Sequence, residues 1–397
     1  MHADRLSAIQ GALVEERLDG WLFYDFRGSD PIAARILNLG ERLATRRWFY
    51  LIPAHGAARG LVSAVEPAAL TGLPGSMTVY RTWQELHAGL AAMLHGHGTI
   101  AMQYSRLNAV PYVSRVDAGT VELVRQSGVD VRTSADLVQR FEAVWTPEQY
   151  ASHCRAARVV RDAVVAAFDE IGARVRAKRP CDEGGIQRFL LEQFAARGVV
   201  THHPPIVAAG PHSADPHYET PAAGSAIDTG DFVLIDLWAK EPDGVYADIT
   251  WTGYVGTVVP PRHATVFDIV RRARDAGVAA AREGVAGATS PRGCDVDAAV
   301  RHVIDTAGYG EHFVHRTGHS IGVEVHGNGA NIDGFETPDS RRLLSGTCFS
   351  IEPGIYLAGE FGVRSELNAF VDGAEIVVTG EPIQSAVVAI LGDRAEL

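Results

Sequence analysis

Three histidines stand close together in the segment HRTGHSIGVEVH, which covers residues 315–326. They are His315, His319 and His326, and imidazole side chains commonly bind divalent metals or act as general acids and bases. The spacing of four between the first two resembles that of helical zinc motifs. However, no glutamate follows His315, and Gly318 disfavours a helix. The segment therefore indicates metal or acid–base chemistry without assigning it to one histidine.

Two aspartates interrupt a pair of apolar, strand-like runs. The runs FVLIDLWA (232–239) and VYADITWT (245–252) flank the five-residue loop KEPDG, a pattern that predicts a β-hairpin. A hairpin centred on Pro242 would place Asp236 opposite Asp248, where the two carboxylates repel unless a cation lies between them. A metal explains this pattern. A bulge that turns one aspartate to solvent, or backbone hydrogen bonds at a turn, explains it as well.

A second pair of acids, Glu352 in SIEPGIY and Glu366 in GVRSE, is symmetric about Gly359. Four carboxylates and one imidazole, in segments that otherwise read as core, suit a pair of divalent ions such as Mn, Co or Zn. Two such ions about 3.5–4 Å apart are a common arrangement in hydrolases. The acids therefore change the interpretation of the histidines, because only one nitrogen ligand is needed to complete the set.

The ordered residues Asp, Asp, His, Glu and Glu lie in IDLWAKEPDGVYADIT, HRTGHSIGVEVHG, SIEPGIY and GVRSE. This order resembles the pita-bread metallopeptidases, which include Xaa-Pro dipeptidases (prolidases), Xaa-Pro aminopeptidases and, more distantly, methionine aminopeptidases. The resemblance covers roughly residues 140–397, and the preceding segment is similar to a creatinase-type amino-terminal domain. It implies two divalent ions, with Mn expected ahead of Co or Zn. The implied metal ligands are Asp236, Asp248, His319, Glu352 and Glu366.

The resemblance also implies roles within that set. Asp236 would bind one metal, Asp248 and Glu366 would bridge both, and His319 with Glu352 would complete the other. Glu352 would also be catalytic, carrying a proton from the nucleophilic water to the leaving nitrogen. The sequence departs from the family at two positions that do not hold metal, Trp251 in place of a frequent arginine and Leu367 in place of a frequent acid.

Five further positions match residues of the family that surround the metals. His217 and His326 would contact the substrate at the scissile bond and stabilise the oxyanion, as catalytic and substrate-binding residues. His315 would line the pocket on the leaving-group side. Tyr356 and Arg364 would support the site and bind substrate.

The elements that must position these residues divide into two predicted domains. Residues 1–140 alternate helical stretches with short apolar strands, which predicts an α/β domain of creatinase type. Residues 141–397 predict an α+β pita-bread catalytic domain. Thr146 followed by Pro147 predicts the start of a long helix ending near residue 178, and a second long helix is expected over 261–283.

Composition limits the partners of the protein. The formal charge of −12, from 36 basic and 48 acidic side chains, lacks the basic footprint that nucleic acid or an anionic membrane surface requires. The four cysteines are widely spaced and read as reduced thiols. No signal peptide or membrane-spanning run is visible, so a cytoplasmic location is expected.

The expected function is hydrolysis of short proline-containing peptides by an Xaa-Pro dipeptidase. The length near 400 residues, the short first domain and the interval of fourteen between the two glutamates favour it over an Xaa-Pro aminopeptidase. A non-enzymatic pita-bread binding protein and a metal-free, creatinase-like amidinohydrolase are alternatives, but both would leave the retained carboxylates unexplained.

A dipeptidase needs a cation for the free carboxylate of its substrate. Arg341, Arg342, Arg364 or an arginine of the first domain are the candidates. A homodimer is expected, and residues 25–31 and 46–48 would either wall the site of a neighbouring subunit or form a solvated loop and a strand edge. His202, His203 and His212 read as loop residues.

Overall fold

The computed structural model describes residues 3–40, 44–287 and 290–392. These residues form two compact units, Met1–Glu142 and Ala143–Leu397, called unit 1 and unit 2 below. None of the helices described is long and apolar enough to cross a membrane.

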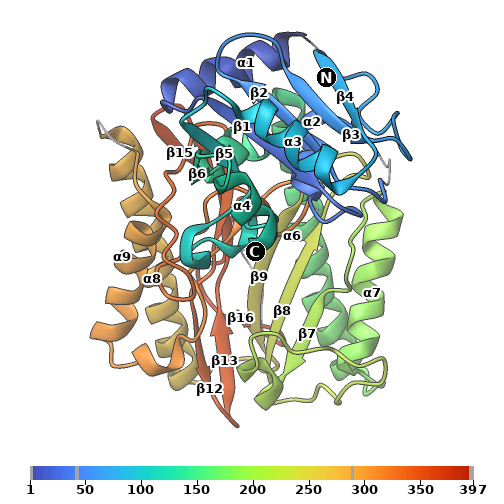
Figure 1. Ribbon diagram of the computed structural model, residues 1–397. Helices are drawn as coiled ribbons and strands as arrows, with labels where there is room; N and C mark the ends of the chain where they lie inside the picture. The colour runs from blue at the N-terminus through green and yellow to red at the C-terminus, as the bar shows by residue number, and fades with distance from the viewer. Residues whose placement is uncertain (1–2, 41–43, 288–289, 393–397) are drawn as a thin grey trace. The chain divides into compact units, whose positions relative to one another are not determined.

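Unit 1 is a six-stranded mixed sheet with helices packed against it (Figure 1). The strand order is β4-β3-β2-β1-β5-β6. Its strands are β1 (Gly20–Asp25), β2 (Trp48–Pro53), β3 (Arg59–Ser63), β4 (Ser76–Tyr80), β5 (Thr99–Met102) and β6 (Asp130–Thr133). Its helices are α1 (Ala3–Glu15), α2 (Pro31–Leu37), α3 (Trp83–Leu94), α4 (Ala118–Arg125) and α5 (Ala135–Val138), with short 3₁₀ turns at Arg106–Asn108 and Pro111–Val113. A π-helical turn, Gln139–Ala143, leads into unit 2.

The central strands β1 and β2 of unit 1 are buried on both faces, which is why they read as continuous apolar runs. In β1, Trp21 and Phe23 belong to one hydrophobic cluster, while Leu22 and Tyr24 belong to another. Because successive side chains of a strand point to opposite faces, the sheet has a core on each side.

Unit 2 has two pairs of helices that flank its strands (Figure 1). The helices are α6 (Pro147–Arg176), α7 (Glu183–Ala196), α8 (Pro261–Ala286) and α9 (Gly293–Thr306), with short 3₁₀ turns at Gly210–Ala214 and Gly310–His312. The helix predicted after Thr146 is confirmed as α6, whose first turn is closed by a capping box between Thr146 and Gln149. The helix predicted over 261–283 is α8.

The helices α7 and α9 were not predicted. Both begin with glycine-containing turns, EGG and GCD, and glycine weakens the helical pattern in a sequence. In α7 the first of these glycines is required by packing. A Cβ at Gly184 would lie 2.4 Å from the carbonyl oxygen of Ala222, so only glycine allows that chain to approach the helix.

The strands of unit 2 form three sheets, ordered β16-β9-β8-β7, β10-β11-β14-β15 and β12-β13. The first comprises β7 (Ile206–Ala209), β8 (Phe232–Ala239), β9 (Ala247–Tyr254) and β16 (Val388–Ala389). The second comprises β10 (Ser320–Ile321), β11 (Cys348–Ile351), β14 (Leu367–Asp372) and β15 (Glu375–Thr379). The third comprises β12 (Gly354–Leu357) and β13 (Phe361–Arg364).

The predicted register of the β8–β9 hairpin is wrong by two residues. Asp236 pairs with Thr250, and Asp248 pairs with Trp238. The reason is a longer connection: the last cross-strand pair is Ala239 with Ala247, because Lys240 leaves the hairpin to pair with Val200. A shift of two residues keeps every side chain on its face, so both aspartates still lie on the same face of the hairpin.

The symmetry about Gly359 is present in two neighbouring pairings. Gly354 pairs with Arg364 between β12 and β13, and Ile351 pairs with Leu367 between β11 and β14. Glu352 and Glu366 occupy the gap where the chain passes from one sheet to the other. These strands therefore bring the two glutamates to corresponding positions despite Pro353.

Candidate metal centre and substrate cavity

Three predicted metal ligands converge in unit 2. The potential ligand atoms of Asp248, His319 and Glu366 all lie within 4.8 Å of one another, and the three residues are buried. Asp248 comes from β9, His319 immediately precedes β10, and Glu366 lies between β13 and β14. Three elements that are distant in the sequence thus supply two carboxylates and one imidazole to one point.

The remaining two predicted ligands border this group. A carboxylate oxygen of Glu352 lies 3.5 Å from Nε2 of His319, and Oδ2 of Asp248 lies at the same distance from that nitrogen. Asp236 is linked to Glu366 through the hydroxyl of Thr250, which is 3.1 Å from the aspartate and 2.8 Å from the glutamate. The structure therefore gathers all five.

The carboxylates are crowded in a buried space. Burial, followed by repulsion from neighbouring carboxylates, raises the pKa of Asp248 and of Glu366 well above the ordinary values. Burial also raises the pKa of Glu352 to about 7, although Arg364 opposes the shift. Burial lowers the pKa of His319 well below its usual value, so this imidazole is neutral and has a lone pair to offer.

The donor set fits divalent cations. Oδ1 of Asp248 and Oε1 of Glu366 are buried without a hydrogen-bond partner, which is costly unless a ligand binds there. Oxygen donors with one imidazole nitrogen suit Mn, Co or Zn, whereas Cu(I) prefers thiolates. The residues that would hold such ions are Asp236, Asp248, His319, Glu352 and Glu366.

Arg364 supports the ligand set from the side. Its guanidinium forms an ion pair with Asp236 and donates to the hydroxyl of Thr250 at 2.9 Å. It also donates to the hydroxyl of Tyr356 at 3.2 Å and to the carbonyl oxygen of Pro216 at 3.0 Å. The planar guanidinium offers several N–H donors and can make all these contacts at once, whereas the ammonium group of a lysine could not.

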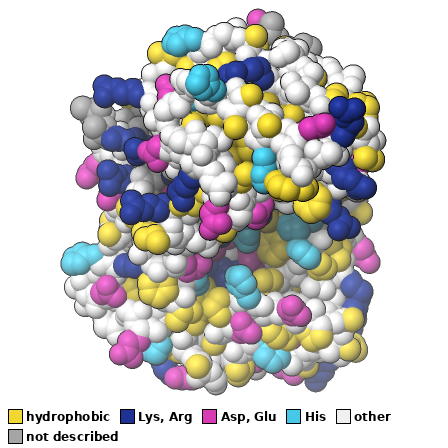
Figure 2. Space-filling model, in the orientation of Figure 1, with side chains coloured by type: hydrophobic (Ala, Val, Ile, Leu, Met, Phe, Trp, Pro, Cys, Tyr) yellow, Lys and Arg dark blue, Asp and Glu magenta, His cyan; other side chains and the backbone are white. Residues whose placement is uncertain are grey.

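The ligand set opens into a cavity of about 640 Å³, a size suited to a small molecule. Histidine and acidic side chains are visible over the region of β8, β9 and β13 in the space-filling view (Figure 2). Three predicted substrate residues, His217, His315 and His326, line the cavity together with Arg364. Tyr356 does not line it. Its hydroxyl lies 2.7 Å from Nε2 of His315, so it supports that histidine from behind.

Two of these histidines are held neutral. Burial lowers the pKa of His315 to about 3 and that of His326 to about 4. The Nδ1 atom of His315 lies 2.7 Å from the carbonyl oxygen of Arg316, which fixes that nitrogen as the donor and Nε2 as the acceptor from Tyr356. The ring of His326 packs edge-on against His319 with centroids 4.3 Å apart.

A family profile settles the relationship of the chain to known proteins. The profile described as metallopeptidase family M24 matches residues 152–372. The chain belongs to metallopeptidase family M24.

Relatives of this M24 metallopeptidase include the probable dipeptidase PepE of Mycobacterium tuberculosis, which is 35% identical over 204 residues, 51% of each chain. The Xaa-Pro dipeptidase of Lactobacillus helveticus is 35% identical over 161 residues, 41% of this chain and 40% of the relative. The aligned part thus spans about half or less of the length of these relatives.

Solved structures share the fold over more of the chain. The dipeptidase PepE of Mycobacterium ulcerans superimposes with a TM-score of 0.71 and 26% identity, covering 97% of both chains. The prolidase of Pyrococcus horikoshii superimposes with a TM-score of 0.64 and 20% identity, covering 97% of this chain and 100% of the prolidase chain. The expected pita-bread fold is confirmed.

Several residues around the M24 site were not predicted. Thr250 contacts Asp236, Glu366 and Arg364, and its place on the same strand face as Asp248 was the signal that could have revealed it. His202 and His203 were interpreted as loop residues but line the cavity, as do Trp238 and Arg316. His202, His203 and Arg316 lie outside helices and strands, so no periodicity marks them in the sequence, whereas Trp238 belongs to β8.

Two of the predicted cations lie elsewhere. Arg341 is buried and bonds both oxygens of Asp339, at 2.9 and 2.6 Å. Arg342 does not line the cavity either, and its guanidinium lies 3.5 Å from the carbonyl oxygen of Ser290. The arginines that line the cavity are Arg316 and Arg364.

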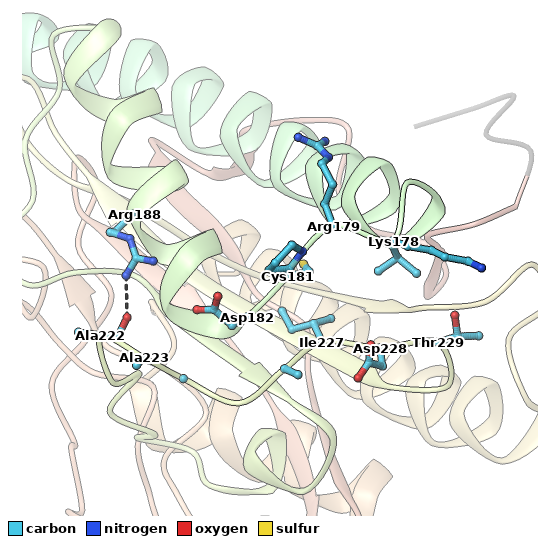
Figure 3. A pocket seen from close by; sticks show the side chains of 14 residues that line it. Lys178, Arg179, Cys181, Asp182, Arg188, Ala222, Ala223, Ile227, Asp228 and Thr229 are labelled. Carbon is cyan, nitrogen blue, oxygen red and sulfur yellow. Dashed lines mark hydrogen bonds between the residues drawn. The ribbon is translucent and has the colours of Figure 1, made fainter.

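A second cavity of about 800 Å³ lies beside the amino-terminal end of α7 (Figure 3). Its basic side chains do not converge: Lys178 and Arg179 extend away from Asp182 and Asp228, and Arg188 donates to the carbonyl oxygen of Ala222 at 2.6 Å. The five ligand-type side chains line the other cavity, of about 640 Å³.

Proposed function

We propose that this chain is an Xaa-Pro dipeptidase that uses two divalent ions, with Mn as the preferred metal. The observation that carries the proposal is the convergence of five ligand-type side chains with the three predicted substrate histidines and two arginines on one cavity. Relatives named Xaa-Pro dipeptidase, from Lactobacillus helveticus and Pyrococcus furiosus, support the choice of substrate.

The ions, when bound, supply a positive field that polarises the scissile carbonyl and lowers the pKa of a water molecule. The protein side chains then handle protons and charge. Glu352 is partly buried beside His319 and takes the proton of the attacking water, then passes it to the prolyl nitrogen. This transfer matters because the nitrogen must leave as an amine. His217 and His326 donate hydrogen bonds to the developing oxyanion.

The carboxylate of a dipeptide substrate requires a cation within the cavity. Arg364 is committed to Asp236, Thr250, Tyr356 and Pro216. We propose that Arg316, which also lines the cavity, contacts the substrate carboxylate, because it directly follows His315, the histidine proposed to lie on the leaving-group side. The proline ring then lies on the His315 side, as expected for the leaving group.

We further propose that unit 1 is a creatinase-type domain and that the enzyme is a homodimer. The edge strand β4 supports the dimer, since it exposes Met77 and Val79, and Trp83 nearby is 62% exposed. The four free cysteines support a reducing, cytoplasmic location.

The test is an assay of the purified protein loaded with Mn, comparing Ala-Pro, Ala-Pro-Ala and Met-Ala, with bound metal measured. Ala-Pro should be cleaved well. Ala-Pro-Ala should be cleaved at least about tenfold more slowly, because a longer peptide lacks the carboxylate at the position of Arg316, and Met-Ala should be similarly slow because it lacks the prolyl leaving group. Equal cleavage of the tripeptide would replace the dipeptidase with an aminopeptidase. Full metal content and turnover in Asp248→Ala would refute the metal centre.

A further inference from the structure

The segment that carries His217 is fastened by one buried carboxylate. Glu183, the first residue of α7, is fully buried and lies outside the cavity lining. Its Oε1 accepts hydrogen bonds from the backbone N–H of Ala209 and from Nδ1 of His212, both at 2.8 Å. Its Oε2 accepts from the hydroxyl of Tyr218 at 2.8 Å and from the backbone N–H of Ser225 at 2.9 Å.

These bonds close a loop at both ends. Ala209 is the last residue of β7, and Ser225 lies shortly before β8, so the carboxylate joins the two ends of the segment that we call the His217 loop, residues 210–224. Closing a loop of this length costs conformational entropy, which the four bonds offset. The glycines Gly184 and Gly224 leave room for the loop to pass directly over the start of α7.

The loop is fixed immediately on either side of His217. The carbonyl oxygen of Pro216 accepts from Arg364, and the hydroxyl of Tyr218 donates to Glu183. The ring of Tyr218 is stacked on His212 with centroids 4.5 Å apart, and His212 is itself bonded to Glu183. One neighbour of His217 is thus tied to the metal side of the cavity and the other to α7.

We propose that Glu183 is a positioning residue that holds His217 against the substrate. The inference rests on the proposed function, because it assigns His217 a substrate contact. Glu183 itself is no candidate ligand: two carboxylate oxygens accept about four hydrogen bonds, and all four are used here.

An amide cannot replace this carboxylate. Each oxygen of Glu183 serves one backbone N–H, that of Ala209 or that of Ser225, and a backbone N–H cannot reverse its role. Whichever way a glutamine side chain is turned, its NH₂ group faces one of them. Glu183→Gln therefore releases one end of the His217 loop while keeping the size of the side chain.

The test is a double-mutant cycle of Glu183→Gln with His217→Ala, assayed with Mn and Ala-Pro. Alone, Glu183→Gln should lower kcat/KM about 10- to 100-fold with unchanged metal content. In the His217→Ala background it should have almost no further effect, because the residue it positions is gone. Hydrogen exchange within residues 210–224 should be faster in Glu183→Gln. The matched control is Glu192→Gln, an exposed glutamate on the same helix, which should change neither quantity.

The outcomes separate the two proposals. Equal losses from Glu183→Gln with and without His217 would overturn the positioning role. An unchanged kcat/KM in His217→Ala would instead refute the substrate role of His217 in the proposed function. If Glu183→Gln does not fold, His212→Ala takes its place, because it removes one bond to Glu183 outside the cavity. A loss of about threefold in kcat/KM that disappears in the His217→Ala background supports the proposal. An additive loss in kcat/KM contradicts it.

Discussion

Asp236 and Thr250 face each other across the β8–β9 hairpin, and the threonine hydroxyl lies 3.1 Å from the carboxylate. The same oxygen is 2.8 Å from Glu366 and accepts a hydrogen bond from Arg364. A hydroxyl has a single proton, so it donates to one carboxylate at a time while accepting from the guanidinium. Thr250 thereby links two proposed metal ligands from opposite sides of the centre.

Removing this hydroxyl should weaken metal binding. Thr250→Val preserves the shape of the side chain, and valine also favours a strand. It leaves Arg364 and the carboxylates of Asp236 and Glu366 without their shared hydrogen-bond partner. Loss of such a supporting contact typically lowers metal affinity about 10- to 100-fold. Titration with Mn, followed by calorimetry, measures this change. Thr252→Val, two residues along the same strand face, is the control, and an equal loss of affinity there would contradict the role of Thr250.

Metal binding should be coupled to proton release. In the metal-free protein the pKa values of Asp248 and Glu366 lie well above the ordinary range, because of burial first and neighbouring carboxylates second. A carboxylate must lose its proton to bind a metal, so Mn affinity should rise with pH until these groups are ionised. Calorimetry at pH 6 in buffers of different ionisation enthalpy should show protons released on binding. Binding without proton release at pH 6 would contradict the crowded centre.

The same crowding makes a prediction about stability without metal. A carboxyl whose folded pKa exceeds its unfolded pKa destabilises the fold as pH rises above the unfolded value, so the contribution of Asp248 and Glu366 to the stability of the metal-free protein should fall from about pH 4 upward. Asp248→Asn removes one of these buried charges. Because a buried charge costs desolvation free energy, the substitution should stabilise the metal-free protein by about 1–3 kcal/mol at pH 8.

Addition of Mn should reverse that order, because only the wild type gains the binding free energy in full. Thermal unfolding of both proteins in EDTA and in Mn measures the two effects. An Asp248→Asn protein that is less stable than wild type in EDTA would show that the carboxylate is compensated without a metal.

The sequence was sufficient for those parts of the fold that depend on local rules. Thr146 and Pro147 predicted the start of α6, because capping needs only residues a few positions apart. The β8–β9 hairpin was predicted with the wrong register, since the departure of Lys240 depends on Val200, which is remote in the sequence. The aspartates were nevertheless assigned to the correct face, because the error was an even number of residues.

The sequence predicted the acids and histidines that converge on the cavity, together with Tyr356 and Arg364, but not the other residues that support them. The carboxylates stand out because buried, unpaired charge is rare in strands. Thr250, Glu183 and Arg316 do not stand out, since threonines are common in strands and acids are common in the first turn of a helix. Their roles arise from contacts with residues more than a dozen positions away, such as Glu183 with Tyr218.

A buried histidine outside the proposed ligand set gives the last prediction. His153 of α6 is completely buried, with Nδ1 2.7 Å from the carbonyl oxygen of Tyr246 and Nε2 2.6 Å from the hydroxyl of Thr379. Burial lowers its pKa from 6.5 to about 4. Because the carbonyl can only accept, Nδ1 carries the proton and Nε2 accepts from the threonine, so the neutral ring is fully bonded.

A histidine with a lowered folded pKa stabilises the protein above the unfolded pKa, and this contribution is lost as the pH falls towards the folded value. Over the window from pH 6.5 to about 4, the loss amounts to roughly 3 kcal/mol. His153→Gln can make both hydrogen bonds without titrating, so the stability advantage of wild type over this variant should shrink by that amount between pH 7 and pH 4. Denaturant unfolding in EDTA, where the carboxylates of the two proteins titrate alike, measures the difference. A constant difference across this range would mean that His153 gains a proton within the folded protein.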